Sequence, residues 1–191
     1  MRKKRFIILD RDGTVIFDRD HLTEVSQVEL IPNAAKAIKK LNELGLGVIV
    51  VTNQTVIGNK HISLRNLKLI HKKMLDLLSN EGATIDRIYF CPHKKEDNCS
   101  CRKPKTGLID RALEDYHFDA EECFVIGDNK GDIELGKNIG AKTILVRTGY
   151  GRQLEKEGLN PDYIVDTLEA VLPVIKDELT KKPQDISQLP L

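Results

Sequence analysis

The segment 6–14, which reads FIILDRDGT, constrains the fold of this chain more than any other. Four apolar residues that end abruptly in charge and glycine predict a buried parallel strand with a site beyond its carboxyl end. Asp10 and Asp12 are two positions apart, so we expect their carboxylates on one side of the extended chain. Close carboxylates need a proton or a cation between them, and Mg²⁺ prefers such oxygen ligands. Gly13 permits a sharp turn to which Thr14 offers a hydroxyl; the alternative is a strand end with two solvated aspartates.

The composition predicts one cytoplasmic domain. The chain has 191 residues, a net charge of +1 and 31% charged residues, a balance that gives no reason to expect a nucleic acid or an acidic membrane as partner. The four apolar residues after the basic N-terminus are too few for a signal peptide, and no apolar run is long enough to cross a bilayer. We therefore expect a cytoplasmic monomer with a single domain, residues 1–180, and a polar, mobile tail, residues 181–191.

Strands and helices are expected to alternate along the chain. Apolar residues at helical spacing, such as Ala37, Ile38 and Leu41, predict helices that bury one face. Pro173 either starts a turn or kinks the last helix, and the charged loop 15–31 is either a flap that contacts substrate or an ordinary surface loop. This alternation predicts an α/β fold: a Rossmann-like parallel sheet with helices on both faces. The expected strands are 6–9, 48–51, 85–90, 123–126, 143–146 and 163–165, and the expected helices are 33–44, 63–81, 106–116, 133–139 and 167–179.

Reactive residues follow four of these strands. Ligands of open α/β sheets bind beyond the carboxyl ends of the strands, so the clusters are expected at one edge. Each cluster alone has a plain explanation: Thr52 as a turn hydroxyl, Lys103 as a solvated cation, or Asp128 as a helix cap. Their order and spacing together predict a catalytic site. The clusters are Asp10/Asp12, Thr52-Asn53, Arg102-Lys103 and Asp128/Asp132.

A second pattern is the cysteine-rich loop 91–101. Three cysteines and one histidine form a C-x-H…C-x-C set, which suits a closed tetrahedral zinc shell of structural type. Free thiols beside a surface histidine are the alternative, and a disulfide is disfavoured in a reducing compartment. Because Arg102 and Lys103 follow the last cysteine directly, zinc would fix both cations at the site. The expected zinc ligands are Cys91, His93, Cys99 and Cys101, while Cys123 is expected to be a core residue.

With these motifs the chain resembles the haloacid dehalogenase superfamily of phosphotransferases. The four motifs are D-x-D-G-T at 10–14, Thr52 after a buried strand, Lys103, and G-D-x-x-x-D at 127–132. Only about forty residues separate Asp12 from Thr52, which leaves no room for a large cap domain and favours a phosphatase over a mutase.

The chemistry of such a site assigns a role to each motif residue. Mg²⁺, held by Asp10, Asp12 and Asp128, neutralises the phosphate so that Asp10 can attack phosphorus and form an aspartyl-phosphate. Asp12 acts as general acid and then base. Thr52 and Lys103 stabilise the transferring oxygens, and Asp132 is a supporting residue.

The loop sequences are similar to those of the heptose 1,7-bisphosphate phosphatases and the histidinol-phosphate phosphatases. The shared segments are LDRDGT (9–14), VVTNQ (50–54), the CPH…CxCRKP loop (91–104) and LVRTG (145–149). The resemblance implies a small phosphorylated sugar as substrate, with removal of the C7 phosphate of a heptose bisphosphate first and histidinol phosphate second. It also implies substrate contacts at Asn53, Gln54, Arg102 and Asn129. The planar fork of Arg102 suits a second phosphate.

The chain departs from this family around the substrate. Ile16 stands where the family usually has asparagine, Asn129 stands where it has lysine, and the segments 18–21 and 55–60 also differ. Two other functions stay open: a nucleic-acid end-processing phosphatase, which the charge balance disfavours, and an inactive zinc module, which the complete set of motifs disfavours.

Overall fold

The computed structural model describes residues 3–181, so the predicted mobile tail lies almost entirely outside the described residues. Its centre is a six-stranded sheet in the order β3-β2-β1-β4-β5-β6, in which all neighbouring strands are parallel. The predicted α/β fold class is confirmed. The strands are β1 (Phe6–Leu9), β2 (Gly47–Asn53), β3 (Arg87–Cys91), β4 (Phe124–Gly127), β5 (Lys142–Val146) and β6 (Tyr163–Val165).

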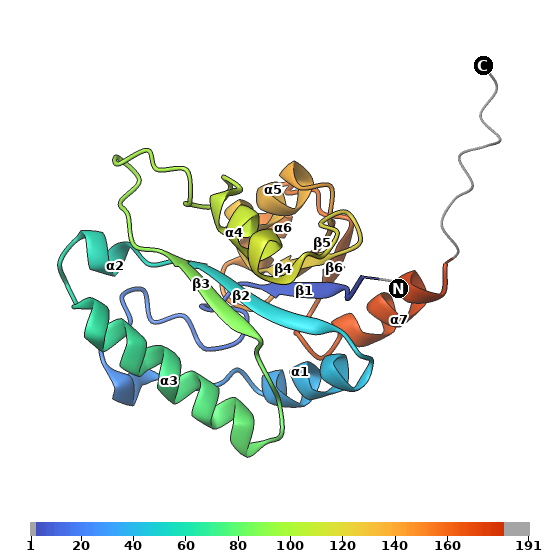
Figure 1. The fold of residues 1–191 in the computed structure, drawn as a ribbon, viewed down its shortest axis with the longest axis horizontal. Helices are drawn as coiled ribbons and strands as arrows, with labels where there is room; N and C mark the ends of the chain where they lie inside the picture. The colour runs from blue at the N-terminus through green and yellow to red at the C-terminus, as the bar shows by residue number, and fades with distance from the viewer. Residues whose placement is uncertain (1–2, 182–191) are drawn as a thin grey trace.

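Helices cover both faces of the sheet (Figure 1). In Figure 1, α1, α3 and α7 lie below the sheet and α4, α5 and α6 lie above it. The helices are α1 (Ala34–Glu43), α2 (Thr55–Gly58), α3 (Leu64–Asn80), α4 (Gly107–Tyr116), α5 (Lys130–Asn138), α6 (Gly151–Lys156) and α7 (Val171–Thr180), with a 3-10 turn η1 (Val25–Gln27).

Several details differ from the sequence prediction. Helix α7 begins at Val171 rather than at 167, and β3 begins at Arg87 rather than at 85. The short helices α2 and α6 were not expected, because neither is long enough to show an apolar period. Helix α5 begins at Lys130 rather than near 133, since Asn129 and Asp132 form a capping box that starts it earlier. Pro173 lies in the first turn of α7, where a missing N–H costs no intrahelical bond, and the helix continues through it.

Alternation along the strands divides the interior into two cores. In β1, Ile7 and Leu9 face the core that α1, α3 and α7 cover, whereas Phe6 and Ile8 face the core under α4. Because both faces of the sheet are buried, the central strands are continuous apolar runs, as β2 also shows. The continuous apolar runs of β1 and β2 are therefore the strongest local signal in the sequence.

The sheet order fixes where a site can form. The chain crosses from β1 to β2 on one side and later places β4 on the other side of β1, so the winding reverses between β1 and β4. A crevice opens at the carboxyl ends of the strands at such a switch point. Asp10 directly follows β1 and Asp128 directly follows β4. Within residues 3–181, no large cap domain is inserted between β1 and α1.

Among the described residues, no helix combines the length and the apolar character that crossing a bilayer requires.

Helix α3 offers a matched test of this packing. Leu67 is fully buried and Leu69, on the same helix, is 46% exposed. We expect Leu67→Ala to lower the free energy of unfolding by about 2–5 kcal/mol, because it removes buried methyl groups and leaves a cavity. We expect Leu69→Ala to change it by less than about 0.5 kcal/mol. Urea unfolding of both variants measures the difference, and equal losses would contradict the assigned face of α3.

Candidate active site

Three carboxylates meet at the switch point. Asp10 follows β1, Asp128 follows β4, and Asp132 lies in the first turn of α5. One oxygen of each lies within 4.8 Å of one oxygen of the other two. Asp128 and Asp132 are buried, and Asp10 is nearly so. Carboxylates this close are a suitable ligand set for a divalent cation.

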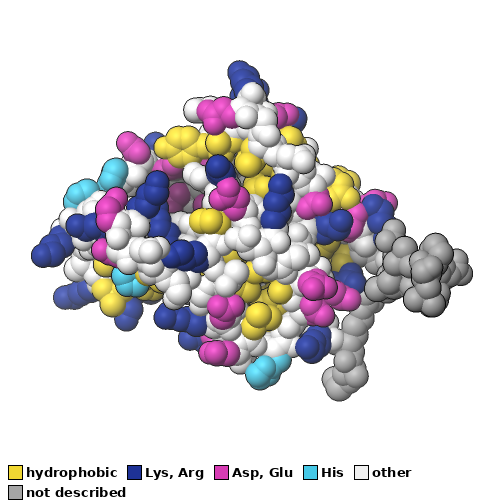
Figure 2. Space-filling model, turned by 90° about the horizontal axis from the view of Figure 1, so that it is seen from above, with side chains coloured by type: hydrophobic (Ala, Val, Ile, Leu, Met, Phe, Trp, Pro, Cys, Tyr) yellow, Lys and Arg dark blue, Asp and Glu magenta, His cyan; other side chains and the backbone are white. Residues whose placement is uncertain are grey.

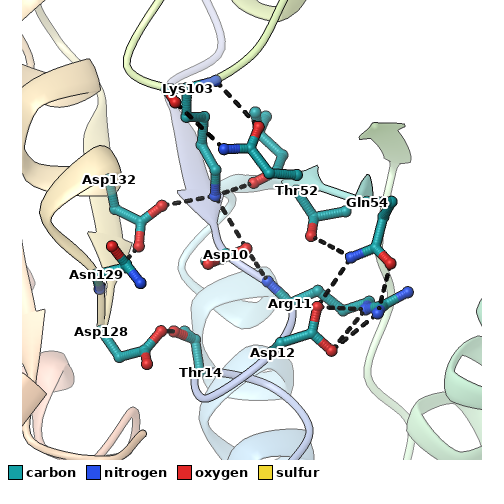
Figure 3. Close-up of polar contacts among 12 residues, drawn as sticks. Asp10, Arg11, Asp12, Thr14, Thr52, Gln54, Lys103, Asp128, Asn129 and Asp132 are labelled. Carbon is teal, nitrogen blue, oxygen red and sulfur yellow. Dashed lines mark hydrogen bonds and ion pairs between the residues drawn. The ribbon is translucent and has the colours of Figure 1, made fainter. Parts of the chain in front are cut away.

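Lys103 joins two of these acids (Figure 3). Its ammonium lies 2.9 Å from Oδ1 of Asp10 and 2.6 Å from Oδ1 of Asp132, and it also donates to the carbonyl of Val51 at 2.6 Å. Lys103 is buried. Burial alone would lower the pKa of Lys103, but the two carboxylates outweigh it and raise the pKa above its ordinary value. Lys103 is therefore a permanent cation in the site.

One lysine does not compensate three acids. Burial, followed by the charge of Asp132, raises the pKa of Asp10 to about 7. Burial, followed by the charge of Asp10, raises the pKa of Asp128 to about 8. Both pKa values are raised because the ionised carboxylates are unfavourable in this buried group when no further cation is present. The site therefore favours a further positive charge beside Asp10 and Asp128.

The backbone approaches Asp128 closely from two sides. Gly13 and Gly149 both have positive φ angles, and a Cβ added to either would collide with the Asp128 carboxylate. The N–H of Tyr150 donates to Oδ2 of Asp128 at 2.9 Å. Only glycine fits at both positions, so two turns remote in sequence hold this carboxylate beside Asp10.

Asp12 does not join the carboxylate group. The third acid of the group is Asp132, and the predicted role of Asp12 as a cation ligand stays a prediction. The chain leaves the strand geometry at the Gly13 turn, and the Asp12 carboxylate pairs with Arg11 at 2.8 Å. Gln54 donates to the same carboxylate at 2.9 Å. An alternation rule for strands fails here because the strand has already ended.

Two predicted substrate contacts use their amides within the protein. Asn53 accepts from the N–H of Lys103 at 3.0 Å and donates to its carbonyl at 3.2 Å, so it fixes the backbone of the lysine. Gln54 donates to the hydroxyl of Thr52 at 2.9 Å in addition to its bond to Asp12. Both side chains line the cavity, but their polar groups bond to Lys103, Asp12 and Thr52.

The acids and Lys103 lie at the base of a cavity of about 750 Å³. The predicted substrate residues Arg102 and Asn129 line it, together with Asp18 and Asp20 of the loop 15–31. Arg102 also donates to the carbonyl of His93 at 3.4 Å, which ties it to the cysteine loop. A cavity of this size suits a small ligand. The position of Asp18 and Asp20 favours the flap interpretation of the loop over an ordinary surface loop.

The four predicted zinc ligands lie together. Their ligand atoms are all within 4.8 Å of one another. The sulfurs of Cys91 and Cys99 are 3.6 Å apart, as are those of Cys99 and Cys101, and Nδ1 of His93 is 3.2 Å from the sulfur of Cys101. A tetrahedral shell with Zn–S bonds of ~2.3 Å has edges of about 3.8 Å. The donor set and its spacing therefore fit zinc, and Cys123 is a buried core residue away from it, as predicted.

Two residues near the site were missed by sequence reasoning. Arg11 is 1% exposed and stands between the two motif aspartates; a charged residue that immediately follows a buried strand was the available signal. His71 of α3 is also buried and packs edge-on against Phe90. Burial, followed by the charge of Arg11, lowers the pKa of His71 to about 3, so the ring is neutral. Nothing in the sequence spacing distinguished it from the other histidines.

Comparison with known proteins gives related sequences over most of the chain. The HAD-hydrolase-like family model matches residues 100–171. A D-glycero-beta-D-manno-heptose-1,7-bisphosphate 7-phosphatase of Pseudomonas putida is 36% identical over 169 residues, which are 87% of this chain and 97% of that protein. The protein of the same name in Neisseria meningitidis is 40% identical over 151 residues, 78% of this chain and 80% of that protein.

Two further relatives widen the comparison. The histidine biosynthesis bifunctional protein HisB of Campylobacter jejuni is 31% identical over 160 residues, 82% of this chain, but the match covers only 46% of that protein. A crystal structure of D,D-heptose 1,7-bisphosphate phosphatase from B. bronchiseptica, complexed with magnesium and phosphate, matches with a TM-score of 0.86 and 30% identity, over 91% of this chain and 99% of the other.

The sheet order and the carboxylate group define an α/β enzyme whose site lies beyond the carboxyl ends of β1 and β4. The chain belongs to the haloacid dehalogenase-like (HAD) family of hydrolases, since relatives with at least 30% identity match most of its length. The resemblance inferred from the motifs is confirmed.

Removing the lysine tests the balance of charge. At about pH 8 we expect Lys103→Met to lower the free energy of unfolding by about 3–5 kcal/mol, because buried carboxylates lose their cation. Without Lys103 the folded-state pKa of Asp10 rises further above its ordinary value of 3.8. A group whose folded-state pKa is raised destabilises the fold as pH rises. The difference in unfolding free energy between Lys103→Met and the parent should therefore shrink as pH falls to about 5, where the acids take up protons.

Urea unfolding at the two pH values, without added divalent cation, measures this deficit. Lys142→Met is the control, since Lys142 is exposed and its 3.8 Å ion pair with Asp162 is worth less than about 1 kcal/mol. A deficit that is the same at both pH values would contradict the proposed compensation.

Proposed function

We propose that the protein is a Mg²⁺-dependent phosphomonoester hydrolase that acts through an aspartyl-phosphate and removes the C7 phosphate of D-glycero-D-manno-heptose 1,7-bisphosphate. The observation that carries the proposal is the joint position of Asp10, Asp128 and Lys103 at the switch point, at the base of the cavity. A nucleophile, a cation site and a fixed ammonium are what phosphoryl transfer requires.

The reaction has two proton-coupled steps in this proposal. Asp10 attacks phosphorus and forms an O–P bond while the bond to the leaving oxygen breaks, and Asp12 gives that oxygen a proton. Asp12, now ionised, takes a proton from water as the water oxygen attacks phosphorus. The aspartyl O–P bond breaks, which restores the Asp10 carboxylate and releases phosphate. Lys103 and the hydroxyl of Thr52 stabilise the transferring oxygens.

The proposed cation fits the residues present. Asp10 and Asp128 would hold Mg²⁺, whereas both oxygens of Asp132 are engaged, one by Lys103 and the other by the N–H of Asn129 at 3.0 Å. When bound, the ion supplies the charge that neutralises the phosphate. The raised pKa values of Asp10 and Asp128 support the need for that charge.

The substrate proposal rests on the relatives and on the cavity. The relatives from Pseudomonas putida and Neisseria meningitidis carry the name of a heptose-1,7-bisphosphate 7-phosphatase. Arg102 lines the cavity beside Lys103 and is suited to a second, non-reacting phosphate. The second candidate substrate is histidinol phosphate, which has one phosphate. The similarity to the HisB proteins of histidine biosynthesis supports it.

We expect no nucleic acid as substrate. The net charge is +1, and the face shown in Figure 2 carries basic and acidic side chains interspersed rather than one continuous basic surface. Nucleic-acid binding relies on a continuous basic patch. A monomeric state and a cytoplasmic location stay predictions.

A phosphate-release assay tests the function. With Mg²⁺ present, we expect the protein to release one phosphate from heptose 1,7-bisphosphate, with both anomers and histidinol phosphate assayed beside it. We expect Asp10→Asn to lose at least about 10³-fold in kcat, since it removes the nucleophile. Equal turnover by Asp10→Asn would sink the covalent mechanism.

The variant Arg102→Ala discriminates between the two substrate classes in the same assay. It should reduce kcat/KM for the bisphosphate by about 10-fold or more, because a charge-assisted bidentate contact is lost. Turnover of histidinol phosphate should change much less. A similar loss for both substrates would contradict a second-phosphate role for Arg102.

We further propose that zinc in the cysteine loop supports catalysis by holding Lys103 in place. Removal of zinc by chelation, or by Cys99→Ser, should reduce kcat by up to about 10²-fold, the typical cost of losing one preorganised donor. Elemental analysis gives the zinc content, and phosphate release gives the turnover. Cys123→Ser changes a buried cysteine outside the loop and should keep both zinc and activity. Full turnover by zinc-free protein would refute the idea.

A further inference from the structure

The buried guanidinium of Arg11 bonds to the carboxylate of Asp12. Its Nε lies 3.1 Å from Oδ1 and 3.0 Å from Oδ2 of Asp12, and its Nη2 lies 2.8 Å from Oδ1. The arginine side chain is 2% exposed, whereas the aspartate side chain is 22% exposed. The guanidinium therefore holds the carboxylate from the protein side and leaves it open toward the cavity, which Asp12 lines. A fork of this kind fixes both position and rotation of a carboxylate.

Gln54, which directly follows β2, bonds to both Arg11 and Asp12. Its Oε1 accepts from Nη2 of Arg11 at 2.9 Å, and because a guanidinium has only donors, this bond determines which end of the amide is oxygen. The NH₂ group must then face Asp12 and Thr52, to which it donates at 2.9 Å in both cases. Gln54 is buried. One amide thus orients two groups of the proposed reaction.

The bond to Thr52 has a direct consequence for its hydroxyl. Because the Thr52 oxygen accepts from Gln54, the hydroxyl proton is left to be donated elsewhere. Asp12, Arg11 and Gln54 lie together on the side of Asp10 opposite Lys103 and Asp132 (Figure 3). The two cations of the site therefore serve different acids: Lys103 pairs with Asp10, and Arg11 pairs with Asp12.

We propose that Arg11 and Gln54 are positioning residues, forming a buried clamp that holds the Asp12 carboxylate at the cavity wall where it exchanges a proton with the leaving group and with water. The inference rests on the proposed phosphatase reaction. In that reaction Asp12 gives its proton to the leaving oxygen as the P–O bond breaks, and it takes a proton from the attacking water in the next step. Neither Arg11 nor Gln54 needs to touch the substrate.

Loss of the clamp should change how kcat/KM depends on the leaving group, whereas a general loss of structure should lower kcat/KM equally for all substrates. A leaving group that is a good anion departs without a proton, whereas a poor one needs the acid. The assay uses phenyl, 4-nitrophenyl and 2,4-dinitrophenyl phosphate, and kcat/KM reports the steps up to P–O cleavage. We expect Gln54→Met to lower kcat/KM for phenyl phosphate by about 10²-fold more than for 2,4-dinitrophenyl phosphate, because the lost bond to Thr52 affects all the esters alike and only the lost bond to Asp12 depends on the leaving group.

Three further variants complete the experiment. Gln54→Glu keeps the shape and the acceptor for Arg11 but loses the donor to Asp12, so it should show the same dependence on the leaving group. Asp12→Asn should show the full dependence, because the acid itself is gone. Thr143→Val removes a buried hydroxyl on β5 that donates to Asp162 at 2.7 Å. This variant should keep the parent's dependence of kcat/KM on the leaving group even if it is less stable.

The outcomes separate the two proposals. A loss by the Gln54 variants that is equal for all three esters, or no loss, would overturn the clamp while the phosphatase proposal stands. If the parent protein hydrolyses aryl phosphates but not heptose bisphosphate, the substrate proposal fails and the clamp is still tested. Parent protein that releases phosphate from no ester would overturn both.

Discussion

The ion pairs of Lys103 with Asp10 and Asp132 are the interaction on which the rest of the site depends. The ammonium is buried and lies within 2.9 Å of both carboxylates. Without it, three largely buried acids would meet with no cation, and an uncompensated buried charge is strongly destabilising. One cation cannot balance three acids, as the raised pKa values of Asp10 and Asp128 indicate. The site is therefore built with an incomplete charge balance, which one divalent cation can complete.

The position of Lys103 is itself set by two distant segments. Lys103 lies in the connection between β3 and α4, which has no regular structure of its own. Asn53, at the end of β2, binds both the N–H and the carbonyl of this residue. On the other side, the group of three cysteines and one histidine ends two residues before it. A loop tied at both points loses conformational freedom before substrate arrives, which is the condition for a preorganised donor.

Much of this arrangement could be predicted from the sequence, and the reasons for success and failure are local. The apolar runs of β1 and β2 and the residues after them predicted a parallel sheet with reactive groups at one edge, because a buried strand has few alternatives. The spacing of cysteines and histidine predicted the cluster around Cys99. The hydrogen-bond partners of Asn53 and Gln54 could not be predicted, since an amide near a site can bond to substrate or to protein and the sequence does not distinguish the two. Only the partners of each amide end decide. The partners of the Asp12 carboxylate could not be predicted for a similar reason, because they include a buried arginine one residue away.

The separation of Asp10 and Asp12 explains how two acids two residues apart can do different work. Identical groups in one environment would titrate together and repel each other. Here the chain turns at Gly13, and each carboxylate meets its own cation from a different part of the fold: Lys103 reaches Asp10 from the loop after β3, and Arg11 holds Asp12 from beneath. The acid beside the lysine is deep and next to Asp128, which suits attack on phosphorus. The acid beside the arginine is partly open to the cavity, which suits exchange of protons with a leaving group or water. In the proposed reaction, two cations on opposite sides of one short turn thus give two identical residues different roles, one as the nucleophile and the other as the acid and base.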